Sequence, residues 1–385
     1  MTRIVVQKFG GSSVADVAKI RLVAARVKAR REQGWQVVVV VSAMGDTTDE
    51  LLGLAKQISA DPPRRELDML LTCGERISMA LLSMALHEQG VAAISFTGSQ
   101  SGIITDSTHA QARIIEVKPA RIEEELARDK VVIVAGYQGV SKNREVTTLG
   151  RGGSDTTAVA LAAALGADCE IYSDVDGIYA ADPRLVPSAA KLESLSFDEM
   201  QELASAGAKV LNAQAVEFAK DKGITIHARS THAAGTGTAI SAASAPARVK
   251  GVTSEREVWV LAASGPCEAL LEQLDALEVK GRTLLSDGGG RTLVLVPLQD
   301  IHSLEAFRAK LPEEVRVLDD VASVSCVGTG LNVDWSIFRK ASAIAAALGA
   351  RLEASYATAL QLTFIVKREH AAELTRRLHA GLIGS

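Results

Sequence analysis

Short runs of β-branched residues alternate with longer helical patterns along the first two thirds of the chain. The most continuous apolar runs, 36–41 and 131–135, are typical of strands buried on both faces of a parallel sheet. Strands are expected at 3–9, 36–43, 92–98, 130–136, 168–174 and 224–229, and helices at 15–33, 47–59, 63–89, 119–128, 154–165 and 209–222. This alternation predicts an α/β domain: a three-layer, mostly parallel sheet with helices on both faces.

The pattern changes near residue 236, where small and polar residues are typical of a linker. Two loosely repeated βαββα patterns follow. Their expected strands are 258–264, 282–287, 291–297, 314–320, 321–328, 351–357 and 360–367, and their expected helices are 267–278, 303–311, 333–348 and 370–381. The second pattern lacks a closing strand, while an unassigned strand at 248–254 precedes the first. Because unpaired edge strands need partners, we expect one unit to lend a strand to the other.

Composition narrows the function classes. A chain of 385 residues is too long for one ordinary core, which predicts two or three domains. A net charge of −4 and 4% aromatic residues argue against a nucleic-acid partner. The four cysteines form no CxxC pair, so we expect a reducing compartment rather than a disulfide framework or zinc site. No apolar run suggests a membrane span or signal peptide, so the predicted location is cytoplasmic, without a membrane partner.

Glycine-rich and charged clusters fall at the carboxyl ends of the predicted strands, where open α/β sheets bind ligands. The stretch "KFGGSS" places Lys8 at the end of the first strand, followed by Gly10, Gly11 and Ser12. Glycine lets backbone N–H groups approach an anion, and the next helix points its positive end at this loop. The alternative is a plain strand–helix turn with a surface lysine. The stretch matches neither the GxxxxGK[ST] loop nor the GxGxxG fingerprint.

Two further clusters suit a small polar ligand. Ser42 and Thr48 in "SAMGDTTDE" offer hydroxyls, although a helix N-cap explains such residues equally well. In "GERIS", Gly74 interrupts a helical pattern at a cost of about 1 kcal/mol relative to alanine, so a nearby backbone or ligand is expected to require it. Glu75 fits an ammonium group, and the alternative is a surface pair with Arg76.

The stretch "LGRGGSDTTA" combines a glycine-rich turn with a helix start. The N–H groups of Gly152, Gly153 and Ser154 lie at the positive end of the helix dipole, and the planar fork of Arg151 matches a carboxylate. Together they predict a carboxylate receptor. Asp155 lies in the first turn, where compensation of the helix dipole is the alternative explanation.

The stretch "YSDVDGIYAADPR" gathers three acids after the fifth predicted strand, with a glycine between them. Such a cluster suggests a nucleotide or metal edge. Further along, Lys209 at a predicted helix start is either a second phosphate contact or a solvated lysine.

These stretches, together with "FTGSQSG", occur in an order that resembles the aspartate kinases of the amino-acid kinase family, from Ile4 to Ile240. The resemblance implies the amino-acid kinase fold and phosphorylation of L-aspartate by ATP to 4-phospho-L-aspartate. That reaction is the first step toward lysine, threonine and methionine. The resemblance also implies Mg²⁺ held through the phosphates, with no metal site among the side chains.

The resemblance assigns roles residue by residue. Lys8 and Asp155 are the implied catalytic residues. The implied substrate contacts are Ser42, Thr48, Glu75, Arg151, Gly152, Gly153 and Ser154. The implied nucleotide contacts are Lys8, Gly10, Gly11, Ser12, Ser173, Asp174, Tyr179, Asp182, Arg184, Lys209 and Val210.

The tail resembles the paired βαββαβ ACT regulatory domains of the same family. The implied boundaries are 1–236 for the kinase domain, 237–250 for the linker, and 251–318 and 319–385 for the two ACT-like units. The turns "SGPCE" (264–268) and "LLSDGGG" (284–290) depart from the family's inhibitor-binding pattern. Lysine, threonine or both stay open as effectors. A homo-oligomer formed through the ACT-like units is expected, and a separately translated ACT subunit, from a start at Val249 or Val252, also stays open.

Two other functions compete with this interpretation. One is a different amino-acid kinase, such as glutamate 5-kinase, which the paired tail and the combination of GRGGSD with GERIS disfavour. The other is an amino-acid sensor with an inactive kinase-like domain. The presence of Lys8, Arg151 and Asp155 together disfavours the sensor.

Overall fold

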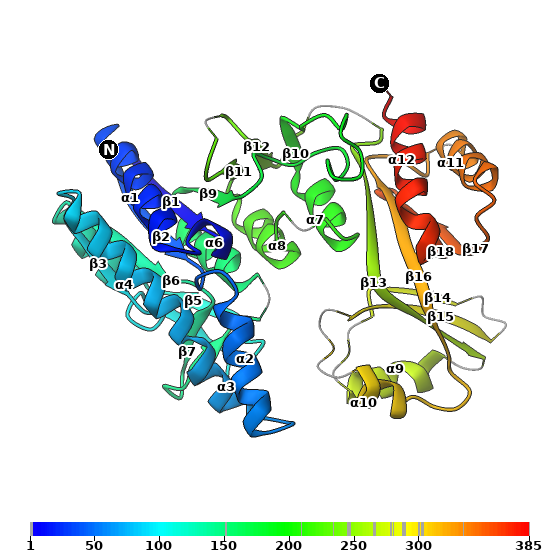
Figure 1. Cartoon of the computed structure of the whole chain (residues 1–385), viewed down its shortest axis with the longest axis horizontal. Helices are drawn as coiled ribbons and strands as arrows, with labels where there is room; N and C mark the ends of the chain where they lie inside the picture. Colours follow the sequence, from blue (N-terminus) through cyan, green and yellow to red (C-terminus); the bar gives the residue numbers. More distant parts are fainter. Residues whose placement is uncertain are drawn as a thin grey trace. The chain divides into compact units, whose positions relative to one another are not determined.

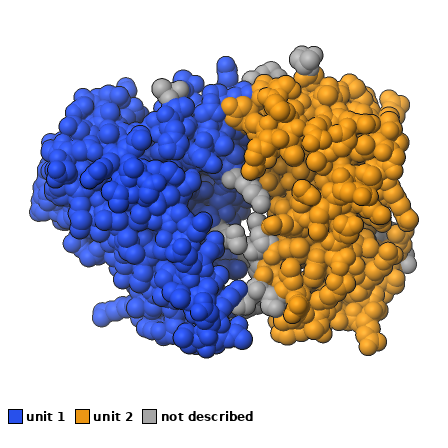
Figure 2. All heavy atoms as spheres, viewed as in Figure 1, with its two compact units in different colours: residues 1–178, 191–201, 209–245 blue, residues 179–190, 202–208, 246–385 orange. Residues whose placement is uncertain are grey.

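The computed structural model describes residues 3–150, 152–208, 210–233, 235–244, 248–264, 267–277, 279, 281–286, 290–298, 301, 304–333 and 335–384. The chain divides into two compact units, which Figure 2 colours separately. The first comprises 1–178, 191–201 and 209–245, and the second comprises 179–190, 202–208 and 246–385.

The first unit is built on an eight-stranded sheet (Figure 1) with the strand order β10-β12-β11-β9-β1-β2-β6-β3. Neighbouring strands run parallel except for β11 and β12, which are antiparallel. The bounds are β1 Arg3–Phe9, β2 Trp35–Val41, β3 Ala93–Phe96, β6 Val131–Ala135, β9 Asp168–Ser173, β10 Ser194–Ser196, β11 Ile226–Ser230 and β12 Thr238–Ser241. All six strands expected in this part of the chain are present, and β12 falls within the stretch interpreted as a linker.

The helices largely follow the expected segments. Their bounds are α1 Val17–Glu32, α2 Thr47–Ile58, α3 Arg64–Leu71, α4 Cys73–Glu88, α5 Ala120–Ala127, α6 Gly153–Leu165, α7 Phe197–Ser205 and α8 Ala213–Lys222. The single helix expected at 63–89 is two helices that meet at Thr72, and α7 was not predicted. Helix α8 begins later than expected because Asn212 caps it, accepting hydrogen bonds from the N–H groups of Gln214 and Ala215.

Strand periodicity explains the three layers. Val5 and Phe9 of β1 share a core with α1 and α4. Helix α1 lies against β2, and helix α4 lies against β3 and β6 (Figure 1). The alternate residues, such as Val6 and Val40, face the opposite side, where α6 packs on β1, β2 and β9. Apolar residues on both faces of the central strands produce this arrangement, which confirms the predicted three-layer, mostly parallel α/β fold.

A smaller four-stranded sheet, ordered β5-β4-β7-β8, was not foreseen. Its strands are β4 Ile103–Thr105, β5 Ile114–Val117, β7 Gln138–Ser141 and β8 Val146–Thr148. The β7–β8 hairpin ends directly before the glycine-rich turn that leads into α6. This sheet therefore positions the start of that turn.

Helices α3 and α4 together, Arg64–Glu88, are long and apolar enough to cross a membrane by length and composition. The sequence had suggested no such run. Asp68 and Glu75 are nevertheless buried within the first unit, and Leu82 and Leu86 belong to its core. Part of this apolar stretch therefore packs inside the first unit.

The second unit contains a six-stranded antiparallel sheet ordered β14-β15-β13-β16-β18-β17. Its strands are β13 Gly251–Ser264, β14 Thr283–Ser286, β15 Arg291–Pro297, β16 Arg316–Val327, β17 Leu352–Ala357 and β18 Gln361–Lys367. Its helices are α9 Cys267–Ala276, α10 Leu304–Ala309, α11 Ser336–Ala347 and α12 Ala371–Leu382.

The long strands β13 and β16 join the two ACT-like halves of this sheet. Residues 251–255 of β13 pair with 323–327 of β16, whereas 258–264 pair with β15. The strand that precedes the first half is thus lent to the second, as expected from the strand count. One apolar core under α9 and α10 and another under α11 and α12 complete the two halves.

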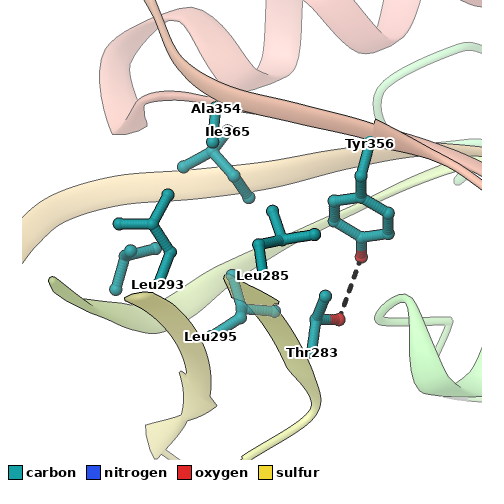
Figure 3. A pocket seen from close by; sticks show the side chains of 8 residues that line it. Thr283, Leu285, Leu293, Leu295, Ala354, Tyr356 and Ile365 are labelled. Carbon is teal, nitrogen blue, oxygen red and sulfur yellow. Dashed lines mark hydrogen bonds between the residues drawn. The ribbon is translucent and has the colours of Figure 1, made fainter. Parts of the chain in front are cut away.

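Along these strands, side chains that face away from the two cores line a small, mostly apolar pocket on the other face of the sheet (Figure 3). Thr283 of β14 and Tyr356 of β17 lie at opposite edges of the sheet order, yet their hydroxyls are 3.1 Å apart. The sheet therefore curls, and its two edge strands approach each other.

Candidate active site

Three loops of the first unit meet at the carboxyl ends of β1, β2 and β9. The amide of Gly10 donates to Tyr172 O at the end of β9 (3.3 Å), and the amide of Ser42 donates to Phe9 O (3.1 Å). The amide of Gly45 donates to Gly11 O at 3.2 Å. The glycine loop after β1 is therefore held between the loops that follow its two neighbouring strands, as parallel pairing predicted.

A glycine is required at position 11 because the backbone of the loop after β2 approaches it closely. A Cβ there would lie 3.0 Å from Ala43 O and 3.2 Å from Gly45 O, tighter than ordinary contacts. Ser13 closes the loop through a 2.6 Å hydrogen bond between its hydroxyl and that of Thr231, while Ser12 remains exposed. The loop thus keeps its backbone and the Ser12 side chain accessible to a ligand.

Lys8 and Asp155 form an ion pair with 2.7 Å between Nζ and Oδ1, and both side chains are largely buried. Asp155 lies in the first turn of α6, directly after Gly153 and Ser154. A buried ammonium needs a counterion, and the positive end of α6 stabilises the carboxylate. The pair therefore joins the β1 loop to the start of α6.

The start of α6 is shaped by Gly152, whose φ of +71° suits glycine. Asn212 packs so closely against Gly152 that a Cβ there would lie 2.3 Å from the side-chain Nδ2 of Asn212. Ser154 is buried. Arg151, the predicted carboxylate ligand, lies outside the described residues, so its placement stays a prediction.

Glu75 lies in the first turn of α4 and is only 3% exposed. Its Oε1 accepts the amide of Ala43 at 3.2 Å, whereas its Oε2 has no hydrogen-bond partner among the residues that the structure describes. Burial raises the pKa of this carboxyl to about 7, and the hydrogen bonds from backbone N–H groups lower it in part. A buried oxygen without a partner is costly, so this position suits a cationic ligand group.

The neighbouring residues explain why Glu75 is held there. A Cβ on Gly74 would lie 2.7 Å from Ala43 Cβ, so the glycine allows α4 to approach the end of β2, as its position in the sequence indicated. The alternative of a surface pair with Arg76 is wrong because Glu75 is buried. Ser42 and Thr48 are partly exposed on the same loop and at the start of α2.

Apart from Lys8 and the glycine loop, the predicted nucleotide contacts fall into three groups. Ser173 ends β9 and is followed by the exposed Asp174, beside the β1 loop. Val210 is partly exposed and precedes α8, and Lys209 lies outside the described residues. Tyr179, Asp182 and Arg184 belong to the second unit.

Asp182 and Arg184 contact each other within that unit. Arg184 Nη2 lies 2.7 Å from Asp182 Oδ2, and this hydrogen bond, the largest cause, lowers the pKa of the aspartate. Both side chains are oriented by their mutual contact.

One polar cluster beside the start of α6 escaped the sequence analysis. It consists of Asp68, His109 and Thr148, and it adjoins Gly150. An aspartate inside the apolar helical stretch 63–89 was the available signal, because a charged residue on a buried helix face needs partners.

Comparisons with known proteins agree with this geometry. The model of the amino acid kinase family matches residues 3–230. Aspartokinase of Mycobacterium tuberculosis (strain ATCC 25618 / H37Rv) is 60% identical over 239 residues, which cover 62% of this chain and 57% of the length of that relative. Aspartokinase of Corynebacterium glutamicum is 43% identical over 400 residues, covering 98% of this chain and 95% of the relative.

Solved structures show the same fold. E. coli aspartokinase III in complex with aspartate and ADP (R-state) superposes with a TM-score of 0.86 at 23% identity, covering 99% of this chain and 100% of the other. Its complex with lysine and aspartate (T-state) gives a TM-score of 0.77 at 24% identity, covering 98% and 99%. Together with the full-length similarity to the corynebacterial protein, these matches show that the chain belongs to the aspartokinases, kinases of the amino acid kinase family.

Proposed function

We propose that this aspartokinase transfers the γ-phosphate of ATP to the side-chain carboxylate of L-aspartate, giving 4-phospho-L-aspartate. The product begins the route to lysine, threonine and methionine. The observation that carries the proposal is the 2.7 Å pair between Lys8 and Asp155, which lies where the glycine loop meets the start of α6. E. coli aspartokinase III, which has this fold, was solved with aspartate and ADP.

The reaction needs positioning and charge neutralisation more than proton transfer. The side-chain carboxylate of aspartate has a pKa near 4, so at neutral pH it is already the nucleophile. Lys8 faces the transferred phosphoryl group and stabilises the charge on its oxygens. Asp155 orients the ammonium of Lys8 and does not act as a base.

The amino acid is held at its two α-substituents. Glu75 takes the ammonium through its Oε2, which has no hydrogen-bond partner within the described part of the chain. Arg151 takes the α-carboxylate, together with the backbone N–H groups from Gly152 to Ser154 at the positive end of α6. The remaining carboxylate is then directed toward Lys8, and Ser42 and Thr48 line the same pocket.

ATP binds along the other side of the glycine loop. Gly10, Gly11 and Ser12 contact its phosphates. Further contacts come from Ser173, Asp174, Tyr179, Asp182, Arg184, Lys209 and Val210.

The residues present fit a Mg²⁺ ion that the nucleotide itself carries. Asp155 is engaged by Lys8, so the ion is held through the phosphates of the nucleotide, as the family resemblance implies. When bound, Mg²⁺ neutralises charge on the phosphate oxygens.

Regulation belongs to the second unit. E. coli aspartokinase III was solved with lysine in its T-state, and the two halves of the six-stranded sheet here correspond to paired ACT-like units. We extend the proposal to inhibition by lysine, threonine or both, to a homo-oligomer formed through these units and to a cytoplasmic location. A separately translated ACT subunit stays open. Parts of the predicted effector turns, 265–266 and 287–289, lie outside the described residues.

The test is an ADP-release assay with aspartate, with glutamate and without acceptor. We expect turnover with aspartate, at least tenfold less with glutamate, and none without acceptor. Preference for glutamate would replace the proposed substrate, and no turnover with either would favour the sensor. Repeating the assay with lysine and threonine, singly and jointly, tests the effector part on its own.

A further inference from the structure

Asp68 on α3 is fully buried and accepts hydrogen bonds with both carboxylate oxygens. Oδ1 accepts Thr148 Oγ1 at 2.6 Å and the amide of Ala110 at 3.1 Å, and Oδ2 accepts His109 Nδ1 at 2.6 Å. A buried carboxylate is tolerated only when donors replace its lost water. Three polar groups from two distant segments therefore converge on Asp68.

Both segments border the turn that leads into α6. Thr148 ends β8 immediately before that turn, and its carbonyl accepts the amide of Ala112 at 2.8 Å. Ala110 O lies 3.3 Å from the position of a Cβ on Gly150. Asp68 thus fixes the strand that enters the turn and the loop that packs beside it.

Backbone strain marks the same place. Ala110 has a φ of 68° and Tyr137 a φ of 69°, a left-handed conformation that is unfavourable for a residue with a side chain. Tyr137 O accepts the amide of Leu149 at 2.9 Å, and its ring lies 3.0 Å from the position of a Cβ on Gly153. Such conformations persist only where the surroundings impose them, and at Ala110 the amide is held by the hydrogen bonds that it donates to Asp68.

The helix that carries Asp68 also leads to the proposed ammonium ligand. α3 meets α4 at Thr72, whose carbonyl accepts Gln138 Nε2 at 3.2 Å, and Glu75 lies in the first turn of α4. The two ends of the proposed aspartate site, Glu75 at one end and Gly150, Gly152 and Gly153 at the other, are therefore both connected to this short helix.

We propose that Asp68 is a positioning residue for the phosphoryl acceptor, which holds Gly150, Gly152 and Gly153 in the shape that receives the α-carboxylate of aspartate. The inference rests on the proposed function, in which this turn binds aspartate. Asp68 does not touch the substrate itself. It acts through Thr148, His109 and Ala110.

The first test is Asp68→Asn in the full-length protein, with steady-state kinetics in both substrates. A displacement of about 1 Å in a binding group costs up to about a hundredfold, so we expect the KM for aspartate to rise about 10- to 100-fold. The KM for ATP should stay within about twofold of its original value. Glu125→Gln is the matched control, because Glu125 is also a buried carboxylate with two hydrogen-bonded cations, Arg128 and Lys130, before the amino end of β6.

Two milder variants keep the inference testable if Asp68→Asn fails to fold. His109→Gln changes a partly exposed ring, and Thr148→Val removes one hydroxyl at nearly constant volume. Each should raise the KM for aspartate about 3- to 10-fold, without a matching change for ATP. Folded variants with an unchanged KM for aspartate, or with both KM values raised equally, would overturn the inference.

Hydrogen exchange at the amides of residues 149–155 gives a readout that does not depend on the substrate. These amides should exchange faster in the variants of Asp68, His109 or Thr148 than in the Glu125→Gln control. Unchanged exchange would reject the positioning role even if aspartate is the substrate. Faster exchange in a protein that proves inactive on aspartate would uphold the role and reject the proposed function.

Discussion

The pH dependence of aspartate binding offers the sharpest test of Glu75. Burial raises the pKa of this carboxyl to about 7, yet an ammonium ligand requires its ionised form. About nine tenths of the free enzyme carries the carboxylate at pH 8 and about one tenth at pH 6. We therefore expect kcat/KM for aspartate to fall about tenfold between pH 8 and pH 6.

The raised pKa of Glu75 also makes the stability of the folded protein depend on pH. Because the pKa of folded Glu75 lies above the 4.5 of the exposed group, burial of the charged form destabilises the protein as pH rises from about 4.5 through about 7. A substrate ammonium compensates this cost. Added aspartate should consequently raise the melting temperature more at pH 8 than at pH 6.

The perturbation is Glu75→Gln, measured by ADP release from pH 6 to pH 8.5. A charge-assisted hydrogen bond is worth about 1.5–3 kcal/mol, so the KM for aspartate should rise about 10- to 100-fold at pH 8. The variant should also lose the fall of kcat/KM at low pH, because an amide does not ionise there. Titration of the ATP phosphates affects both proteins alike, so the difference between the two profiles isolates Glu75.

The control is Glu88→Gln, an exposed acid at the far end of the same helix, which should behave like the unmodified protein. A Glu75→Gln enzyme that keeps both its KM for aspartate and its fall in kcat/KM at low pH would refute the ammonium role. So would an unmodified enzyme with no change in kcat/KM between pH 8 and pH 6.

Three shorter predictions concern other contacts. Lys8→Ala should lower kcat at least about a hundredfold in ADP release while circular dichroism shows an intact fold, and near-normal phosphorylation would remove Lys8 from the mechanism. Gly152→Ala should raise the KM for aspartate, because its φ is +71° and its Cβ would meet Asn212; Asn212→Ala in that background should restore part of the activity. Gly74→Ala should destabilise the fold by about 1–3 kcal/mol in denaturant unfolding, and added Ala43→Gly should relieve it, since the two Cβ atoms would lie 2.7 Å apart.

The central elements of the fold were predictable because the local pattern of apolar residues shows which faces are buried. β2 and β6 are apolar on both faces, as strands between two helical layers must be. The small sheet was not predictable, since its strands have three or four residues and too few positions for a period to show. β13 and β16 were each expected as two strands. Their continuity depends on pairing between segments distant in sequence.

The proximity of the candidate site residues was predictable where topology alone brings them together. Lys8 and Ser173 lie at the carboxyl ends of β1 and β9, and Ser42 directly follows β2. These strands are parallel neighbours, so the proximity of the three residues follows from the strand order. Glu75 was ambiguous, because only the contact of α4 with the end of β2 decides that it is buried. The Asp68 cluster spans three segments with no sequence periodicity in common, so nothing local connects them.

The arrangement of charges explains how one site can bring two anions together. The nucleophilic carboxylate and the terminal phosphate repel each other, so their approach requires positive charge between them, which Lys8 supplies in the proposed mechanism. Asp155 keeps the ammonium of Lys8 neutralised and directed while the site is empty, since a buried cation without a counterion would be costly. Glu75, at the other end of the proposed site, attracts the substrate's ammonium and repels its carboxylates. In the proposed mechanism, Glu75 takes the ammonium, and Arg151 with the start of α6 takes the α-carboxylate. The side-chain carboxylate is then left to face the phosphate.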